Sequence, residues 1–483
     1  MRPYVVILTF ILLACNAREE VLSVPQNGFN EQTDIQVVRS KSPIEFKDPK
    51  NSQIVAISTR EVVDASNLLT ERSKGMVRFI SSNEYESFPD ELESRFEISV
   101  DQEFSAANER SGISLAVYSE GRSWTHAQGE ADIGVRMTPA TPLIISSTSK
   151  TFLSALILSQ VEDGFYQLED NIQSVLANHP KYSMFSNEFI NEKVTVRQLL
   201  AMSSGLSKFD GNIQGKSSSF KEKIWLPSNT IGLIKSPYQL PGKFQYNDTN
   251  VVLLGIIAEF HSGSSLADLY RKEFLDPLNI QAITLPEEGI KWHEDIFNDT
   301  GGDFTQPVLA FPYTDVTRYG TKGFGNLIRT APFEVGYYIG AVRRLSYACC
   351  GIVSTPENIA RWAYELYSPQ GTAITTFTRA KLIDSTSTDR VPPWVVKDGN
   401  DKYGYLISER RFDMNGDAFV KAYGHPGGGG GYSSVMYYSP ELDLAVSILA
   451  NSEMGFRGSC RGEKPLNCIV TDIFRTYWSF LNE

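Results

Sequence analysis

The order of apolar and polar residues is irregular up to about residue 88 and becomes regular beyond it. Helical spacing of the apolar residues predicts a helix over 91–108. Strict alternation predicts a strand over 112–119, and a hairpin turn joins it to a returning strand over 123–129. The regular part of the chain therefore opens with a helix and a β-hairpin.

The carboxyl-terminal part of the chain returns to strands after a long helical middle. Residues 165–345 contain helical pieces and long loops. Strands are predicted over 403–409, 419–423, 432–439 and 442–450, and a closing helix over 469–481. Strands at both ends imply an α/β fold of the α+β type, in which an antiparallel sheet built from both termini is flanked by helices, with an inserted all-helical region.

The most uniformly apolar stretch follows the hairpin and has a serine and a lysine at its start. Residues Phe152 to Val161 are apolar nearly all round, which is typical of a helix at the centre of a domain, and Gly164 is placed to end it. Ser147 and Lys150 lie three residues apart, so on a helix their side chains share one face. A desolvated lysine that is neutral can take a proton from a serine, which makes the serine a nucleophile.

This spacing alone is weak evidence for a catalytic pair, because it recurs at Ser218 and Lys221 in a polar loop. Two later stretches add to the first copy. Tyr246 follows a Pro-Gly turn and precedes a strongly apolar helix, where its alternative role is to pack half-buried beside that helix. His425 precedes a proline and five glycines, which indicate either an edge strand that closely approaches another backbone or a flexible linker.

These three stretches, in this order, resemble the serine β-lactamase and penicillin-binding-protein superfamily. The similar branch is class C-like: class C β-lactamases, D-alanyl-D-alanine carboxypeptidases, D-aminopeptidases and β-lactamase-fold esterases. Tyr246 follows Ser147 by 99 residues and precedes His425 by 179, which fits that branch. The resemblance covers roughly residues 90–483 and also includes the segments 196–206 and 350–355.

The resemblance implies a β-lactamase/transpeptidase-like fold and a role for each residue of the site. Ser147 would be the acylated nucleophile, with Lys150 as its proton partner and Tyr246 as general base and acid. His425, where many relatives have lysine, would orient the tyrosine or a substrate carboxylate. The backbone N–H groups of Ser147 and Gly428 would form the oxyanion hole, and Gly427 and Asp248 would contact the substrate.

Three positions depart from the family pattern. Asp248 stands where asparagine is usual, which would raise the basicity of Lys150. Met202 occupies the place of a histidine and is expected to be structural. His425 removes a permanent cation, which favours a peptidase or esterase over a β-lactamase.

The predicted function is an envelope serine hydrolase. It acylates Ser147 and hydrolyses the acyl-enzyme, acting on a D-amino-acid peptide amide or an ester. Two alternatives remain: a class C-like β-lactamase, and a penicillin-binding fold kept as a non-catalytic scaffold.

The amino terminus predicts export and a lipid anchor. Residues 1–15 form a signal peptide whose Leu-Leu-Ala-Cys end resembles the bacterial lipobox, with Cys15 as the lipidated residue. The alternative is an ordinary secretory signal with a chance cysteine. Residues 16–88 are expected to tether a hydrolase domain over 89–483, and Asn16 favours the outer membrane by resemblance.

Net charge and histidine content limit the classes of binding partner, and the cysteines indicate possible disulfides. A net charge of −12 argues against nucleic acid, and five scattered histidines argue against a metal site; no cofactor is expected. The expected partner is a small-molecule or peptide substrate, with the membrane reached only through the lipid anchor. Cys460 and Cys468 are predicted to form a disulfide, while Cys349 and Cys350 could stay as thiols, and the sequence leaves their disulfide state open.

Overall fold

The computed structural model describes residues 19–22, 37–40, 85–107, 112–132, 135–209, 226–284, 347–387, 390, 401–429, 431–452 and 465–483. The chain divides into two units, 1–62 and 63–483. In the first unit, β1 (Glu19–Leu22) and β2 (Val37–Ser40) form an antiparallel pair within the segment expected to be a tether. Cys15 lies outside the described residues.

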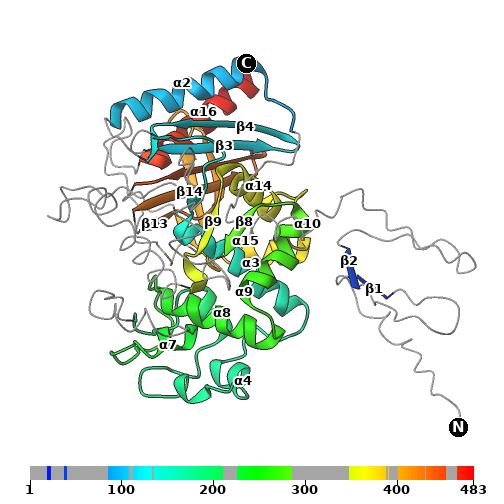
Figure 1. The fold of residues 1–483 in the computed structure, drawn as a ribbon, viewed down its shortest axis with the longest axis vertical. Helices are drawn as coiled ribbons and strands as arrows, with labels where there is room; N and C mark the ends of the chain where they lie inside the picture. The colour runs from blue at the N-terminus through cyan, green and yellow to red at the C-terminus, as the bar shows by residue number, and fades with distance from the viewer. Residues whose placement is uncertain are drawn as a thin grey trace, which may run out of the picture. The chain divides into compact units, whose positions relative to one another are not determined.

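An antiparallel sheet, whose strands come from the first and the last parts of the second unit, forms the frame of that unit (Figure 1). Its strand order is β10-β11-β12-β14-β15-β3-β4, and β13 pairs with β14 beside this path. The strands are β3 (Ile113–Ser119), β4 (Arg122–Gln128), β10 (Lys402–Tyr403), β11 (Ser408–Asp413), β12 (Phe419–Gly424), β13 (Gly427–Gly429), β14 (Tyr432–Ser439) and β15 (Leu444–Ala450). Because β3 from one end pairs with β15 from the other, the predicted sheet assembled from both termini is confirmed.

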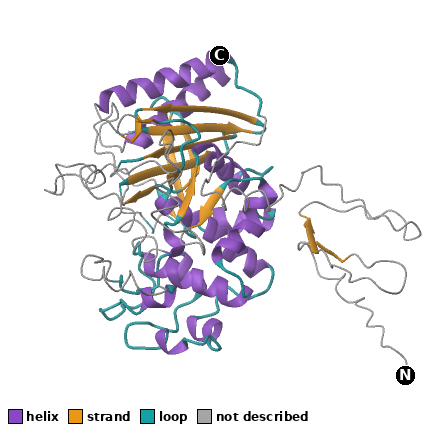
Figure 2. Cartoon of the chain, viewed as in Figure 1, coloured by secondary structure: helices purple, strands orange, loops and turns teal. Residues whose placement is uncertain are grey.

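Alternating side chains of β3 enter two separate hydrophobic clusters. Ile113, Leu115 and Val117 join the cluster under α2 (Asp90–Ala107) and α16 (Pro465–Asn482), which lie side by side. The intervening Ala116 and Tyr118 join the cluster that includes α14 (Pro356–Tyr367). Helices therefore cover both faces of the sheet, as Figure 2 shows.

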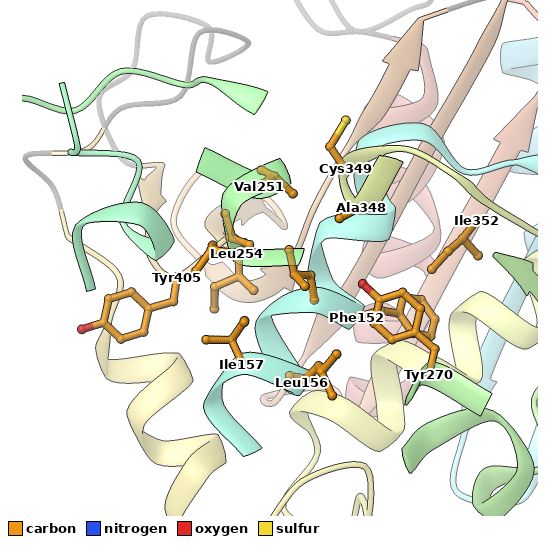
Figure 3. Close-up of a cluster of buried hydrophobic side chains, with 14 of the residues drawn as sticks. Phe152, Leu156, Ile157, Val251, Leu254, Tyr270, Ala348, Cys349, Ile352 and Tyr405 are labelled. Carbon is orange, nitrogen blue, oxygen red and sulfur yellow. The ribbon is translucent and has the colours of Figure 1, made fainter. Parts of the chain in front are cut away.

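The helical region is built around α3 (Lys150–Glu162), which packs against α8 (Asp248–Ser262). Phe152 of α3, labelled in Figure 3, stacks on Trp362 of the same hydrophobic cluster with ring centroids 3.9 Å apart. Its uniformly apolar sequence matches its position, since every residue from Lys150 to Val161 is buried. The predicted central helix is confirmed, and Gly164 has a φ of +81° at its end.

The remaining elements are short. They are β5 (Glu130–Asp132), β6 (Val135–Arg136), β7 (Leu143–Ile144), β8 (Ala282–Thr284), β9 (Ile352–Ser354), η1 (Ser146–Ser149), η2 (Tyr182–Met184), η4 (Arg271–Leu275), η5 (Tyr347–Cys349), α4 (Ile172–Leu176), α5 (Val196–Leu200), α7 (Pro227–Ile231), α9 (Leu266–Tyr270), α10 (Asp276–Leu278) and α15 (Thr376–Asp384). Of the helices described, none alone is long and apolar enough to cross a bilayer, and only the pair 248–262 and 266–278, bent by 79°, meets that test together.

The predicted strand over 403–409 is wrong, because the chain turns in its middle. β10 ends at Tyr403, and Gly404 donates its N–H to the carbonyl of Ile407 at 2.8 Å. Leu406 takes a left-handed φ of +58° and donates to Leu200 of α5 rather than to a neighbouring strand. The single predicted strand is therefore two strands joined by a tight turn.

Candidate active site

Ser147 lies on a sharp turn between β7 and α3. Ser146 before it has a φ of +48°, a left-handed conformation that non-glycine residues rarely adopt. Two contacts to β9 fix the turn: Ile145 donates to the carbonyl of Ile352 at 3.0 Å, and Ile352 donates to Ser149 Oγ at 3.1 Å. Ser147 stays partly exposed while its neighbours Ser146 and Thr148 are fully buried. The turn thus presents one serine to the surface.

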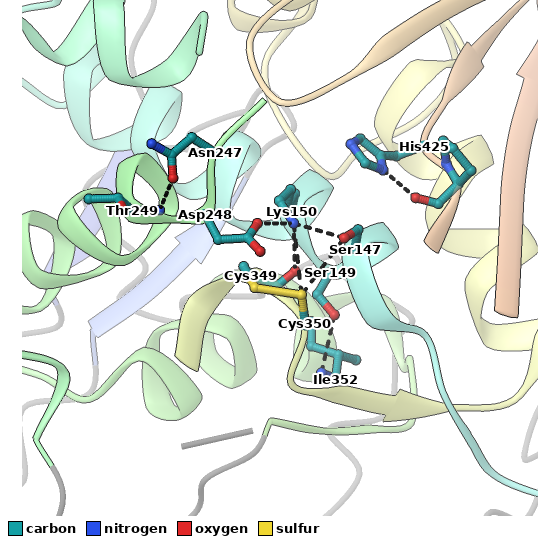
Figure 4. The surroundings of a disulfide bond; sticks show 11 residues. Ser147, Ser149, Lys150, Asn247, Asp248, Thr249, Cys349, Cys350, Ile352 and His425 are labelled. Carbon is teal, nitrogen blue, oxygen red and sulfur yellow. Dashed lines mark hydrogen bonds and ion pairs between the residues drawn. A yellow bond between two sulfur atoms is a disulfide. The ribbon is translucent and has the colours of Figure 1, made fainter. Parts of the chain in front are cut away.

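Lys150 is fully buried and joins three parts of the chain (Figure 4). Its Nζ donates to Ser147 Oγ at 2.9 Å and to the backbone carbonyl of Cys349 at 3.4 Å. It also forms an ion pair with Asp248 Oδ1 at 2.9 Å. The structure therefore brings Ser147 and Lys150 into contact, and adds a carboxylate from the first turn of α8.

The carboxylate decides the protonation state of this lysine. Burial lowers the pKa of Lys150 more than any other single influence, but Asp248 and Tyr246 together outweigh it and the net pKa is raised. Desolvation, which could make a lysine neutral, therefore does not dominate at Lys150, and Asp248 raises its basicity as expected. In the resting site Lys150 is an ammonium group.

Tyr246 reaches the same point from the start of α8. Its hydroxyl interacts with Lys150 and Ser147, the Lys150 Nζ lies 5.1 Å from its ring centroid, and burial raises its pKa. Asn247 caps the helix by accepting from the N–H of Thr249 at 3.0 Å. The tyrosine hydroxyl is therefore neutral and lies within the group formed by the serine and the lysine.

The segment that contains Met202 is hydrogen-bonded to the loop that precedes Tyr246. Gln245 donates its N–H to the carbonyl of Met202, and Gly242 donates to that of Ser203, each at 2.8 Å. Met202 is fully buried, with a φ of +54°. Its backbone carbonyl holds Gln245, and its sulfur accepts from Asn250 Nδ2 at 3.3 Å, in agreement with the structural role predicted for it.

The glycine run forms an edge strand against the serine turn. β13 pairs with β14 alone among the described strands, with Gly428 opposite Ser433. A Cβ on Gly427 would overlap the carbonyl of Ile145 and lie 3.0 Å from the backbone N of Ser147. Only glycine allows this approach, so the edge-strand interpretation is confirmed and the flexible linker is not.

Thr148 and Ser434 hold the serine turn and the glycine strand together. Thr148 Oγ1 donates to the backbone carbonyl of His425 at 2.9 Å and lies 2.8 Å from Ser434 Oγ. Ser434 Oγ in turn donates to the carbonyl of Ile145 at 2.6 Å. The main chain at Ser147 and the main chain of β13 are thereby fixed side by side, which is the arrangement an oxyanion hole requires.

His425 is buried behind the site with both ring nitrogens in use. Nδ1 lies 2.6 Å from the carbonyl of Pro426, and Nε2 lies 3.0 Å from the hydroxyl of Tyr403. Burial, with the nearby Lys150 charge, lowers the pKa of His425 to about 3. An uncharged ring brings no cation to a substrate carboxylate, and the contact of His425 with Tyr246 is through the rings, whose centroids lie 6.0 Å apart.

Tyr403 is a residue of the site that the sequence analysis missed. Burial raises its pKa well above the usual range, so its hydroxyl stays protonated and donates to His425. Its ring lies 6.0 Å from that of Tyr246 and 5.3 Å from that of Phe244. No local pattern marks it, because its contacts come from residues far away in the chain.

The buried neutral histidine predicts a specific pH dependence of stability. Between pH 6.5, the ordinary pKa of histidine, and about 3, the unfolded chain binds a proton on His425 that the folded protein does not. The free energy of unfolding should therefore fall as the pH decreases through this window, by up to ~1.4 kcal/mol per pH unit from this group. His425→Gln should flatten that slope in urea unfolding at pH 6.5, 5.5 and 4.5, and an unchanged slope would contradict the assignment.

The structure settles the state of the two adjacent cysteines, which the sequence left open. Cys349 and Cys350 are bonded to each other as a disulfide. Cys350 Sγ lies 3.7 Å from Ser147 Oγ and accepts from Lys150 Nζ at 3.8 Å. Adjacency in the chain already holds the two sulfurs near each other, so the bond needs no approach of distant segments.

Three other predictions concern the metal site, the disulfide between Cys460 and Cys468, and the second Ser-x-x-Lys sequence at Ser218. Asp248, Cys349 and Cys350 form a group whose ligand atoms lie within 4.8 Å of one another, although these sulfurs are bonded to each other and the carboxylate is paired with Lys150. Cys468 is disulfide-bonded, while its predicted partner Cys460 lies outside the described residues. Ser218 and Lys221 also lie outside them.

Comparison with known proteins agrees with this geometry. The profile of the family described as Beta-lactamase matches residues 100–461. Penicillin-binding protein 4 of Amycolatopsis lactamdurans is 23% identical over 343 residues, covering 70% of this chain and 80% of that protein. Teichoic acid D-alanine hydrolase of Staphylococcus aureus (strain NCTC 8325 / PS 47) is 26% identical over 350 residues, covering 71% of each.

Solved structures show the same fold. D-amino acid amidase from Ochrobactrum anthropi SV3, complexed with L-phenylalanine, superposes with a TM-score of 0.59 at 20% identity, covering 81% of this chain and all of that one. The octameric penicillin-binding protein homologue from Pyrococcus abyssi superposes with a TM-score of 0.56 at 22% identity, covering 80% of this chain and 77% of the other. The predicted β-lactamase/transpeptidase-like fold is confirmed.

Proposed function

Because the chain belongs to the Beta-lactamase family, we propose that it is a serine hydrolase that acylates Ser147 and then hydrolyses the acyl-enzyme. The observation that carries the proposal is the 2.9 Å contact between Lys150 Nζ and Ser147 Oγ at a partly exposed turn. A structural serine has no need of a fully buried lysine held against its hydroxyl. The contact thus favours the enzyme over the non-catalytic scaffold.

Lys150 and Tyr246 share the acid–base work. Both have raised pKa values, so the resting pair holds both protons and loses one as the pH rises. The conjugate base of the pair takes the proton of Ser147 as its oxygen attacks the substrate carbonyl. The same proton then passes to the leaving amine or alcohol, and the pair activates water in the second half of the reaction.

The oxyanion that forms during both steps is bound by main-chain N–H groups. Those of Ser147 and Gly428 are the donors, on two segments that Thr148 and Ser434 hold together. Each such donor typically contributes about 3–4 kcal/mol of transition-state stabilisation. Gly427 contributes by permitting the close approach of β13.

The substrate class follows from the charge of the site. His425 is uncharged and Lys150 is already paired with Asp248, which disfavours a substrate that carries a carboxylate next to the scissile bond. D-aminoacyl amides and esters lack that group, whereas a D-Ala-D-Ala terminus and a β-lactam have it. The names of two relatives, a D-amino acid amidase and a teichoic acid D-alanine hydrolase, support the same choice.

A substrate panel and a chemical probe test the proposal together. A fluorophosphonate adduct is expected on the peptide that contains Ser147 and not on the one that contains Ser218, as located by mass spectrometry. D-alanine amide and a D-alanyl ester should be hydrolysed faster than their L-forms, diacetyl-Lys-D-Ala-D-Ala and nitrocefin. Preferential turnover of nitrocefin would instead establish the β-lactamase alternative, and no adduct at all would establish the scaffold.

Asp248 should set the pH at which the enzyme becomes active. Asp248→Asn removes an interaction that raises the pKa of Lys150 while the lowering effect of burial stays, so the pKa falls. Because activity requires deprotonation of the Lys150–Tyr246 pair, the acid limb of the kcat/KM profile should move to lower pH. Asp268→Asn, which removes an exposed partner of Arg271, is the matched control. An acid limb that stays in place would show that Asp248 does not control the base.

The proposed setting is the bacterial cell envelope, with Cys15 as a lipid anchor and residues 16–88 as the tether. The lipobox-like end of the leader supports this location. The partner is a small-molecule or peptide substrate and not nucleic acid, as the net charge of −12 supports. Metabolic labelling with a palmitate analogue should mark the full chain and not Cys15→Ala; equal labelling would favour an ordinary secretory signal.

A further inference from the structure

The Cys349–Cys350 disulfide forms part of the wall around the serine. Cys350 Sγ lies 3.7 Å from Ser147 Oγ and 3.8 Å from Lys150 Nζ, and the carbonyl of Cys349 accepts from the same ammonium at 3.4 Å. Figure 4 shows this disulfide between Asp248 and Ser147. The pair therefore touches the reacting group as well as its base.

The segment that carries the disulfide is held firmly in this position. A Cβ on Gly255 of α8 would overlap Tyr347 and Ala348, so α8 packs directly against η5. On the other side, β9 begins at Ile352 and is bonded to the serine turn through Ser149. A change in the two sulfurs is thus transmitted to the site rather than absorbed by movement of the segment.

We propose that Cys349 and Cys350 form a redox-sensitive control of the Ser147 site, in which the disulfide permits acylation and the dithiol suppresses it. This inference rests on the proposed function, because it concerns regulation of the same site. It assigns these cysteines a role other than packing, although Cys349 also belongs to the buried cluster in Figure 3.

The switch is a thiol–disulfide exchange with a dithiol reductant. A thiolate of the reductant attacks one sulfur of the pair and forms a mixed disulfide, which frees the other cysteine. The second thiol of the reductant then attacks the reductant sulfur in that mixed disulfide, which closes the reductant's own disulfide and frees the first cysteine. The net change is two electrons and two protons to the protein, which becomes a dithiol, while the reductant becomes a disulfide. Cys350 is the less buried of the two sulfur-bearing residues, since it is 8% exposed and Cys349 is fully buried.

Reduction changes what surrounds Lys150. Once the S–S bond is broken the sulfurs separate to nonbonded distance, and the Cys350 thiol lies against an ammonium group. A neighbouring cation favours loss of the Cys350 thiol proton to the solvent, which leaves a thiolate. That thiolate accepts a hydrogen bond from Lys150 in competition with Ser147 Oγ, and its charge holds the lysine proton more tightly. Lys150 is then less able to take the serine proton, and a negative charge stands beside the forming oxyanion.

Fluorophosphonate labelling of the intact protein, with and without dithiothreitol, tests the inference. Alkylation and peptide mapping establish when Cys349 and Cys350 have become thiols. At that point the second-order labelling rate should fall by about tenfold, the effect of a one-unit rise in the pKa of the base. Reoxidation with glutathione disulfide should restore the original rate. A rate that stays constant while both cysteines are alkylated would overturn the proposal.

Two variants separate this pair from the rest of the protein. Cys349→Ser combined with Cys350→Ser should label at one rate whether or not reductant is present, measured against its own basal rate. The disulfide of Cys468 is a second target of the reductant, so Cys468→Ser is the control. This variant should keep the full response, because Cys349 and Cys350 are intact in it. A response that is lost in Cys468→Ser and kept in the double variant would assign the effect to that other disulfide and overturn the proposal.

The same experiment distinguishes the two levels of inference. If the oxidised protein fails to label on Ser147, the proposed function is wrong and the control of that site falls with it. If the oxidised protein labels and the reduced protein labels equally fast, the hydrolase stands and only the redox control is wrong.

Discussion

Ser147→Ala is expected to abolish covalent labelling by a fluorophosphonate and to reduce hydrolysis of a D-alanyl ester to near background. The variant removes the only atom that forms the acyl-enzyme, while Lys150, Tyr246 and β13 remain in place. Loss of a catalytic serine in comparable hydrolases lowers kcat by roughly 10⁶-fold, and the binding groups that remain retain some rate over water. The loss should appear in kcat and in burst amplitude, because no acyl-enzyme accumulates.

Ser218→Ala is the matched control, since Ser218 has the same spacing to a lysine but lies in a polar segment. Its labelling and kcat/KM should equal those of the wild type. Full activity in Ser147→Ala, or loss of activity in Ser218→Ala, would contradict the choice of nucleophile.

Lys150→Met is expected to have the second-largest effect. The side chain keeps its length and packing but loses the amine that contacts Ser147 Oγ at 2.9 Å. General acid–base groups typically contribute 10²–10⁴-fold, so kcat/KM should fall by about 10³-fold. The rate of fluorophosphonate labelling should fall in parallel, because acylation is the affected step.

The charge left on Asp248 requires its own control. Lys150→Met leaves that carboxylate without its partner, which destabilises the fold as well as the site. The double variant Lys150→Met with Asp248→Asn should recover thermal stability and not activity, whereas Lys221→Met should change neither. Recovery of activity in the double variant would show that Tyr246 suffices as base and that Lys150 only neutralises Asp248.

The sequence by itself determined the local elements and the features that depend on near neighbours. Alternation of apolar residues in 112–119 predicts a strand there, although both faces of that strand are buried in the fold. The contact between Ser147 and Lys150 follows from a spacing of three residues at the start of a helix. Glycines beside His425 predict a close backbone approach, because nothing larger than hydrogen fits there.

Only the tertiary structure decided the chemical state of the site. Tyr403 reaches His425, Asp248 reaches Lys150 and Cys350 reaches Ser147 across 22, 98 and 203 residues of chain, and such contacts leave no periodic signal. The protonation of Lys150 could not be predicted either, because it is the difference between burial, which lowers its pKa, and neighbours from other segments, which raise it. The sequence thus determined which residues could react, and the packing of distant segments decided their charge and their surroundings.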